Sequence, residues 1–285
     1  MLTVIGTLPD PHVPLISGSV EHHSGILKID GRWEFPVQRG TSALLAAACE
    51  TIKHLGNIMP RAILAGDSGK GDGSRQIYRY LVQNPESLKT NVLVFHYLFP
   101  DVDWHGKILM ALETVSPKPT LVADAGFMYV AKMSGHASFY DLFTPDVGEL
   151  AFLADEEAPH PFYTRGFIIH QENNIPALIH RAYSHGNAAK NLLVKANRDY
   201  LVVNGQIIET VSEPDVPALE AIGGTGDTLT GIVSALLDCG FELSRAMIVA
   251  AKANRIMGLL ANPGIETPIA KLISHIREAI NKAML

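Results

Sequence analysis

The stretch Gly223-Gly224-Thr225-Gly226-Asp227-Thr228 marks the start of a helix whose glycines leave its backbone open to a ligand. Helical periodicity follows it, with an apolar face made by Leu229, Ile232, Val233, Leu236 and Leu237. Because glycine has no side chain, an anion can reach the unpaired N–H groups at the positive end of the helix dipole. The stretch therefore predicts a phosphate site, beside which the Asp227 carboxylate fits a base that takes the proton of an attacking hydroxyl.

A structural alternative accounts for the same residues. Thr225 or Asp227 can cap the helix with its side-chain oxygen, and the glycines then form only a tight turn. Such caps are common, so this stretch by itself leaves both interpretations open.

The composition of the whole chain limits the classes of protein that need to be considered. With 285 residues, 47% of them hydrophobic and 18% charged, the chain can bury a sizeable core and is expected to be ordered nearly throughout. A formal net charge of −6 with scattered Lys and Arg argues against a nucleic-acid partner. There is no apolar run of membrane-spanning length and no secretory leader at the start, so we expect no membrane partner and a cytoplasmic protein.

Short β-rich runs alternate with longer helical segments, which is typical of a parallel sheet covered by helices. The expected strands are residues 2–5, 61–65, 92–97, 120–123, 192–195 and 200–203. The expected helices are residues 42–55, 74–83, 104–115, 147–154, 175–185, 227–239, 244–261 and 268–283.

Two β-hairpins interrupt this alternation, one over residues 25–35 turning at Asp30-Gly31 and one over residues 200–208 turning at Asn204-Gly205. The first is a candidate flap or oligomer contact. No repeat or linker divides the chain, so residues 1–285 are interpreted as a single domain.

Four segments together resemble a known family. Gly224-Thr225-Gly226-Asp227 resembles the GxGD motif of the ribokinase-like superfamily, and residues 223–231 are similar to the form found in ATP- or ADP-dependent NAD(P)H-hydrate dehydratases, the YjeF carbohydrate-kinase-like proteins. In the family's order, residues 121–125 resemble its strand ending in Asp-Ala-Asp, residues 144–149 its Thr-Pro-His-Pro-Gly-Glu, and residues 192–196 its strand ending in Leu-Lys-Gly. The resemblance covers residues 60–285. It implies a three-layer α/β/α fold with a mainly parallel central sheet, and ATP or ADP with Mg²⁺ as cofactors.

The matched segments carry further candidate site residues. Asp146 and Glu149 lie near a helix N-terminus, where they are either a cap and a dipole-satisfying acid or, as the resemblance implies, organisers of Mg²⁺ through water. Asp124 ends a strand, where ligands collect in open α/β sheets, although a solvated carboxylate is equally compatible with that place. Lys195 is similarly placed and is a candidate phosphate contact or a surface lysine.

A second glycine-rich stretch, residues 65–74, fails the P-loop pattern because Gly71 replaces the Ser or Thr after Gly69-Lys70. By order it corresponds to the family's Gly-Pro-Gly-Leu-Gly turn, which makes Gly66, Ser68 and Gly69 candidate substrate-binding residues. Asp72 or Ser74 is expected to cap the helix that follows.

The histidines are dispersed, and we expect them on the surface or in loops rather than in a zinc site. No Gly-x-Ser-x-Gly elbow and no Rossmann glycine fingerprint is present, which argues against hydrolase and dehydrogenase interpretations.

The resemblance implies that the nucleotide phosphorylates the hydroxyl of hydrated NADH or NADPH and that elimination of phosphate restores the dihydropyridine. Asp227 would be the base, and the Gly223–Gly226 turn, through the Gly224 and Gly226 amides, the anion hole. The segment before the alanine-rich run 43–48 departs from the family, and Asp146 replaces the usual His, so the acceptor stays open. The alternatives are an ATP-dependent sugar or vitamin-precursor kinase and a non-catalytic nucleotide-binding regulator, which the retained Asp227 disfavours. ATP or ADP, NADH or NADPH, and a homo-oligomeric state are left undecided.

Overall fold

A computed structural model describes residues 1–166, 174–264 and 266–285. Its centre is an 11-stranded sheet in the order β11-β10-β9-β8-β7-β6-β1-β5-β2-β3-β4. The strands are β1 (Leu2–Leu8), β2 (Ile16–His23), β3 (Ile26–Ile29), β4 (Trp33–Pro36), β5 (Arg61–Gly66), β6 (Val92–His96), β7 (Thr120–Ala123), β8 (Leu142–Phe143), β9 (Asn191–Val194), β10 (Asp199–Val203) and β11 (Gln206–Val211).

The middle of this sheet is parallel and its two edges are antiparallel. The strands from β9 through β8, β7, β6 and β1 to β5 pair in parallel. Strands β10 and β11 extend one edge and β2, β3 and β4 the other, all in antiparallel pairs. Every residue of β1 is buried, as expected of a parallel strand covered on both faces. The prediction of a mainly parallel central sheet is confirmed.

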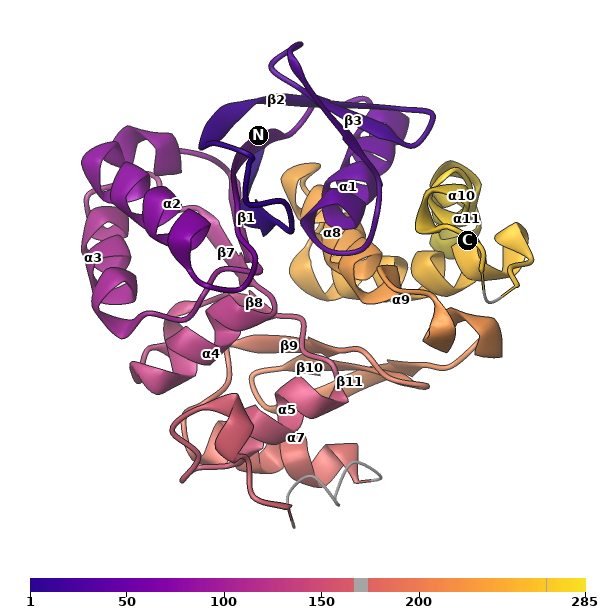
Figure 1. Cartoon of the computed structure of the whole chain (residues 1–285). Helices are drawn as coiled ribbons and strands as arrows, with labels where there is room; N and C mark the ends of the chain where they lie inside the picture. The colour runs from indigo at the N-terminus through magenta and orange to yellow at the C-terminus, as the bar shows by residue number, and fades with distance from the viewer. Residues whose placement is uncertain (167–173, 265) are drawn as a thin grey trace.

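Helices cover both faces of the sheet and make a three-layer α/β/α molecule (Figure 1). One face packs against α1 (Thr41–Leu55), α8 (Thr225–Asp238), α9 (Leu243–Ala261), α10 (Ile269–Ile273) and α11 (Ile276–Met284). The other packs against α2 (Asp72–Gln83), α3 (Val102–Glu113), α4 (Gly126–Met133), α5 (Val147–Ala154) and α7 (Ile175–Ser184). Each face has its own apolar core, and the sheet separates the two cores.

Both expected hairpins are present, and in the first one Asp30 and Gly31 have φ of 52° and 66°, which the tight turn requires. Two strands, β2 and β8, were not expected. Strand β2 reads Ile-Ser-Gly-Ser-Val-Glu-His-His and is rich in residues that favour turns, while β8 has only two residues. The single helix expected over residues 268–283 is wrong, because the chain turns at Ser274–His275 and divides it into α10 and α11.

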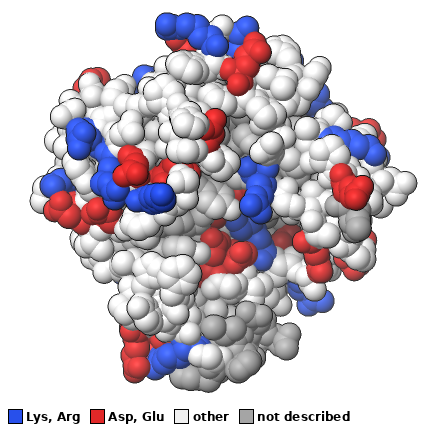
Figure 2. Space-filling model, in the orientation of Figure 1, with Lys and Arg blue, Asp and Glu red and all other residues white. Residues whose placement is uncertain are grey.

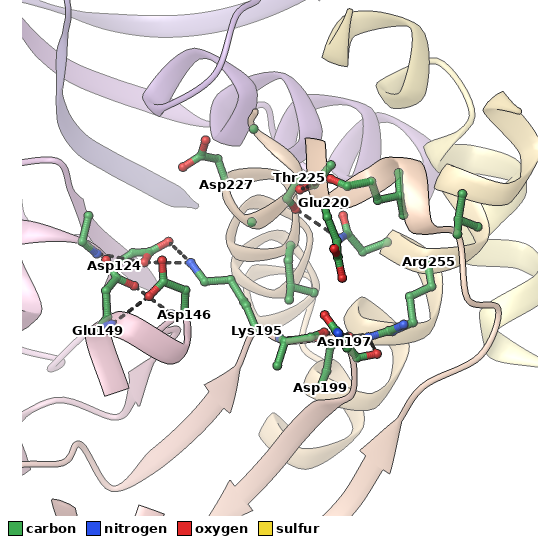
Figure 3. A pocket seen from close by; sticks show the side chains of 18 of the residues that line it. Asp124, Asp146, Glu149, Lys195, Asn197, Asp199, Glu220, Thr225, Asp227 and Arg255 are labelled. Carbon is green, nitrogen blue, oxygen red and sulfur yellow. Dashed lines mark hydrogen bonds and ion pairs between the residues drawn. The ribbon is translucent and has the colours of Figure 1, made fainter. Parts of the chain in front are cut away.

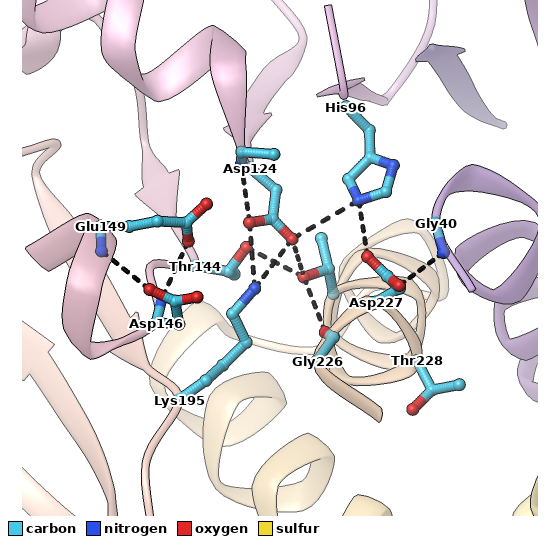
Figure 4. A network of polar contacts seen from close by, with 12 residues as sticks. Gly40, His96, Asp124, Thr144, Asp146, Glu149, Lys195, Gly226, Asp227 and Thr228 are labelled. Atoms are coloured by element: carbon cyan, nitrogen blue, oxygen red, sulfur yellow. Dashed lines mark hydrogen bonds and ion pairs between the residues drawn. The ribbon is translucent and has the colours of Figure 1, made fainter. Parts of the chain in front are cut away.

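The loops that follow the parallel strands lie together at the carboxyl ends of those strands. The carboxyl ends of β6, β7, β8 and β9 all meet there, and the N-terminus of α8 lies against them (Figure 4). The carboxyl ends of these strands are therefore the place to look for a ligand site.

Among the helices that the structure describes, none is both long and apolar enough to cross a membrane.

Candidate active site

A cavity of about 460 Å³ opens at the carboxyl ends of the parallel strands (Figure 3). Its size lies within the range of small-molecule sites, and Val216, Leu219 and Leu229 give it an apolar side. Of the residues singled out in the sequence, those that line it are Asp124, Asp146, Glu149, Lys195, Gly224, Thr225, Gly226 and Asp227. Gly223 lies beside them, against Arg39. Acidic and basic side chains are interspersed over the face shown in Figure 2, without a basic stripe.

Helix α8 begins at the cavity without a side-chain cap. Its N-cap is Gly224, with φ of 106°, and no side chain accepts from the first turn. The capping alternative is therefore wrong: the Thr225 hydroxyl donates to the Ile222 carbonyl at 3.3 Å instead. The left-handed backbone of Gly224 favours glycine, and a Cβ there would lie in tight contact with Ile269 Cγ1, at 3.1 Å. The amides at this helix start remain available to an anion.

Asp227 lies in the first turn of α8 and is held from two sides (Figure 4). Its Oδ2 accepts the Gly40 amide at 2.6 Å, and its Oδ1 lies 3.1 Å from His96 Nε2. Burial alone would raise the pKa of Asp227, but the hydrogen bond from His96, the charge of Lys195 and the Gly40 amide hold it below its ordinary value. The carboxylate is thus kept ionised although it is buried.

The buried Asp124 and the partly buried Lys195 form an ion pair at the carboxyl ends of the same strands. Lys195 Nζ lies 3.0 Å from both carboxylate oxygens of Asp124, and the Thr230 hydroxyl of α8 donates to Asp124 Oδ2 at 2.6 Å. Burial would lower the pKa of Lys195, but the carboxylates of Asp124, Glu149 and Asp227 raise it above its usual value. Lys195 is therefore a fixed cation beside the glycine turn, where a Cβ on Gly226 would approach its side chain to 3.3 Å.

Asp146 and Glu149 form a capping box at the start of α5. Asp146 Oδ1 accepts the Glu149 amide at 2.7 Å, and Glu149 Oε2 accepts the Asp146 amide at 2.8 Å. Both also line the cavity, so the structural interpretation and the predicted metal interpretation apply to the same two residues. Removal from water, together with the charges of Asp124 and Asp146, raises the pKa of Glu149. Such an oxygen-only set, one member of which readily holds a proton, fits a hydrated Mg²⁺ that would take the proton's place.

The second glycine turn lies outside the cavity lining. Asp67 accepts the amides of Gly69, Lys70, Gly71 and Ser74 at 2.9–3.0 Å, together with the Ser74 hydroxyl at 2.9 Å. The expected cap is wrong, because the N-cap of α2 is Gly71 and neither Asp72 nor Ser74 has that role. The amides of this turn are already satisfied by an internal carboxylate, so they are not available to an anion.

The three candidate substrate residues of that turn are not brought to the cavity lining. Gly66 is buried, and a Cβ on it would lie 1.8 Å from the Asp10 carbonyl oxygen. Ser68 and Gly69 are exposed. Their role on the substrate side stays a prediction.

His96 is the main residue that the sequence did not single out. The expectation of surface or loop histidines is wrong for His96 and His105, both fully buried. His96 Nε2 also lies 3.7 Å from Asp124 Oδ2, and one ligand atom from each of His96, Asp124 and Asp227 lies within 4.8 Å of the others. Such a set can hold a metal ion, but these atoms already bond to one another, to Thr230 and to Lys195, so we describe them as a hydrogen-bond cluster.

Comparison with known proteins adds independent information. A family model described as NAD(P)H-hydrate dehydratase matches residues 104–280. An uncharacterised protein of Methanocaldococcus jannaschii is 37% identical over 242 residues, which are 85% of this chain and 100% of that protein.

Solved structures share the fold at low sequence identity. A ribokinase-like superfamily protein of Enterococcus faecalis has a TM-score of 0.58 at 16% identity, covering 99% of this chain and 87% of that one. Phosphofructokinase-2 of Escherichia coli, solved with fructose-6-phosphate, has 0.56 at 15%, covering 98% and 99%. The ADP/ATP-dependent NAD(P)H-hydrate dehydratase of Bacillus subtilis, co-crystallised with ATP/Mg²⁺, has 0.56 at 13%, covering 99% and 88%.

Proposed function

The chain belongs to the carbohydrate-kinase-like family described as NAD(P)H-hydrate dehydratase, and from that premise we propose that it uses ATP or ADP to dehydrate hydrated NADH or NADPH. The nucleotide supplies the phosphoryl group that makes the hydroxyl of the hydrate a good leaving group. The acceptor's hydroxyl proton passes to Asp227, and the amides of Gly224 and Gly226 bind the phosphate. Lys195 stabilises its negative charge, and Asp146 and Glu149 would hold Mg²⁺ through water.

One observation carries this proposal: an ionised, buried carboxylate stands in the first turn of an uncapped helix at the wall of a cavity. A helix start without a cap favours an anion, and a carboxylate beside that anion has no favourable role in binding it. A base for an attacking hydroxyl is the role that explains both features together. The apolar side of the cavity, near Leu219 and Leu229, gives room for a nucleobase.

A kinase that releases a stable phosphate ester is the second candidate. It is favoured by Asp146, which stands where the dehydratases carry His and shifts the segment toward the kinase pattern. The family match begins at residue 104, so Gly40 and the rest of residues 1–103 lie outside it.

A coupled assay separates these activities. Enzyme, Mg²⁺ and ATP or ADP are mixed with hydrated NADH, and the absorbance of the reduced nicotinamide is followed together with free phosphate. Regained absorbance with one phosphate per dinucleotide supports the dehydratase. A stable phosphate ester formed from a panel of alcohols, with no regained absorbance at high enzyme concentration, supports the kinase instead.

We further propose that residues 1–285 form a single domain, since one sheet runs through the chain from β1 to β11. Hairpin 25–35 fits an oligomer contact better than a flap. It lies at the sheet edge with Trp33 41% exposed, and none of its residues lines the cavity. Sedimentation of the wild type and of Trp33→Ala tests this, with a shift toward smaller species expected for the variant.

A further inference from the structure

His96 ends strand β6, and its side chain has no exposed surface. Figure 4 shows one nitrogen of its ring directed at the carboxylates of Asp227 and Asp124, which dashed lines join to it. The other nitrogen, Nδ1, lies 3.0 Å from the Thr41 hydroxyl at the start of α1. The ring is therefore held at both nitrogens by partners that are distant in the sequence.

The partners determine where the imidazole carries its proton. The ionised Asp227 carboxylate can only accept hydrogen bonds, and so can the Asp124 carboxylate, whose Oδ2 lies 3.7 Å from the same nitrogen. Nε2 must then carry the hydrogen. The Thr41 hydroxyl can donate to a bare Nδ1, which makes the neutral ring with its proton on Nε2 compatible with every contact around it.

We infer that His96 is the positioning residue of the base: its Nε2–H fixes Asp227 Oδ1, so that the carboxylate keeps one orientation and stays ionised while buried. This inference rests on the proposed function, in which Asp227 accepts the proton. With Oδ1 held by His96 and Oδ2 by the Gly40 amide, the carboxylate cannot turn away from the cavity. A buried carboxylate that lost the His96 contact would bind a proton more readily and would no longer act as a base.

Other groups around Asp227 do not replace this contact. The nearby titratable groups on the packed elements are Tyr97 at the end of β6, Asp124 after β7, Glu149 on α5 and Lys195 after β9. Tyr97 is a neutral phenol, because burial raises its pKa, and the negative charge of the Asp124 carboxylate would favour protonation of Asp227. Lys195 is bonded to Asp124, so His96 is the donor that reaches Asp227 from the side of the sheet.

The test compares His96→Gln with His96→Met. A glutamine amide can place an N–H close to the position of Nε2, whereas methionine has similar bulk and no donor. With ATP, Mg²⁺ and hydrated NADH, we expect His96→Met to lower kcat about tenfold or more and to move the acidic limb of the pH profile up by about one unit. His96→Gln should keep most of kcat and the wild-type limb, and ATP affinity should be unchanged in both. Equal losses in the two variants with an unmoved limb would mean a structural role and would overturn the inference.

A second measurement needs no substrate and stands even if a variant fails to fold. Nitrogen-15 NMR of histidine-labelled wild-type protein reports which ring nitrogen of His96 carries the proton. We expect the proton on Nε2, and a change in that resonance in Asp227→Asn. A bare Nε2 would refute the inference even if the enzyme turns over, whereas a protonated Nε2 with no turnover of any hydrate would leave His96 in place and remove the proposed function.

Discussion

Two helices in this molecule, α2 and α8, begin at a glycine-rich turn, and the two turns differ in whether a carboxylate already accepts their amides. Both helices have a glycine N-cap in the left-handed conformation, Gly71 with φ of 82° and Gly224 with φ of 106°, and both carry an aspartate in the first turn. Asp67 accepts three amides of the turn before α2 and the Ser74 amide inside that helix, while none of the carboxylates that the structure describes has this role at the start of α8. A glycine-rich helix start is thus an anion site only when no internal carboxylate already fills it.

The two first-turn aspartates differ as much as the turns do. Asp72 of α2 is exposed and pairs with Arg75 at 2.7 Å, as an ordinary surface ion pair does. Asp227 of α8 is buried and bonded to His96 and Gly40. Burial and hydrogen bonding, rather than position in the helix, distinguish Asp227, the proposed base, from Asp72.

Replacing the two aspartates separately tests this difference, and we expect it to give the largest effect. Asp227→Asn should lower turnover by about 10²–10⁴-fold, the usual contribution of a general base, with ATP affinity changed only a few-fold. The matched control, Asp72→Asn, should keep wild-type turnover because its side chain faces solvent. Steady-state phosphate release and calorimetric ATP titration measure both quantities. Full turnover in Asp227→Asn would remove the assigned base.

Asp67→Ala should give the next largest effect, on stability rather than on turnover. The variant leaves four amides and a hydroxyl without their acceptor, which we expect to cost roughly 2–4 kcal/mol in the free energy of unfolding. Burial would raise the pKa of Asp67, but hydrogen bonds from Ser74, Gly71 and Gly69 hold it below its ordinary value.

The sign of the pH dependence follows from that lowered pKa. The stabilisation by Asp67 is complete above about pH 4, the value in the unfolded chain, and is lost as pH falls through the lower folded value. Urea unfolding of wild type and Asp67→Ala should therefore differ fully at pH 7 and progressively less below pH 4. A difference that grows on acidification would contradict the contact as described.

Gly224→Ala should give the smallest of these effects, on nucleotide affinity. The left-handed backbone disfavours alanine, and its Cβ would also press on the Ile269 side chain at 3.1 Å, so we expect the turn and its amides to shift. We expect ATP to bind about tenfold more weakly. Gly240→Ala at the other end of α8, with φ of 88° and open space, carries the same backbone strain and should leave ATP affinity unchanged. Equal losses in both variants would assign the effect to helix stability.

Local sequence patterns predicted most of the individual strands, helices and hairpins of the fold. Most strands and helices around the site follow from apolar periodicity, although β8 and α4 were not predicted, and both hairpins follow from their turn residues. Strand β2 and the break between α10 and α11 could not be predicted, because a polar edge strand and a one-turn interruption leave the pattern nearly unchanged. The family resemblance, rather than periodicity, predicted that Asp124 and Lys195 belong to one site.

Of the contacts that distinguish the two turns, those of His96 could not be predicted from local patterns, whereas those of Asp67 could. His96 meets Asp227 across 131 positions in the sequence and Thr41 across 55, and nothing near His96 predicts either partner. The filling of the α2 turn by Asp67 spans only two to seven positions, so an Asp followed by Gly-Lys-Gly and Ser at this spacing was a usable signal. That signal would have separated the α2 turn from an anion site at the outset.

A crystal structure with Mg²⁺ and a non-hydrolysable ATP analogue tests the central claim most directly. We expect the terminal phosphate at the amides of Gly224 and Gly226, near Lys195 and with Asp227 beside it, and the metal ion on the side of Asp146 and Glu149. Phosphate bound over Gly69–Gly71 with Asp67 displaced, or bound away from α8 altogether, would contradict it.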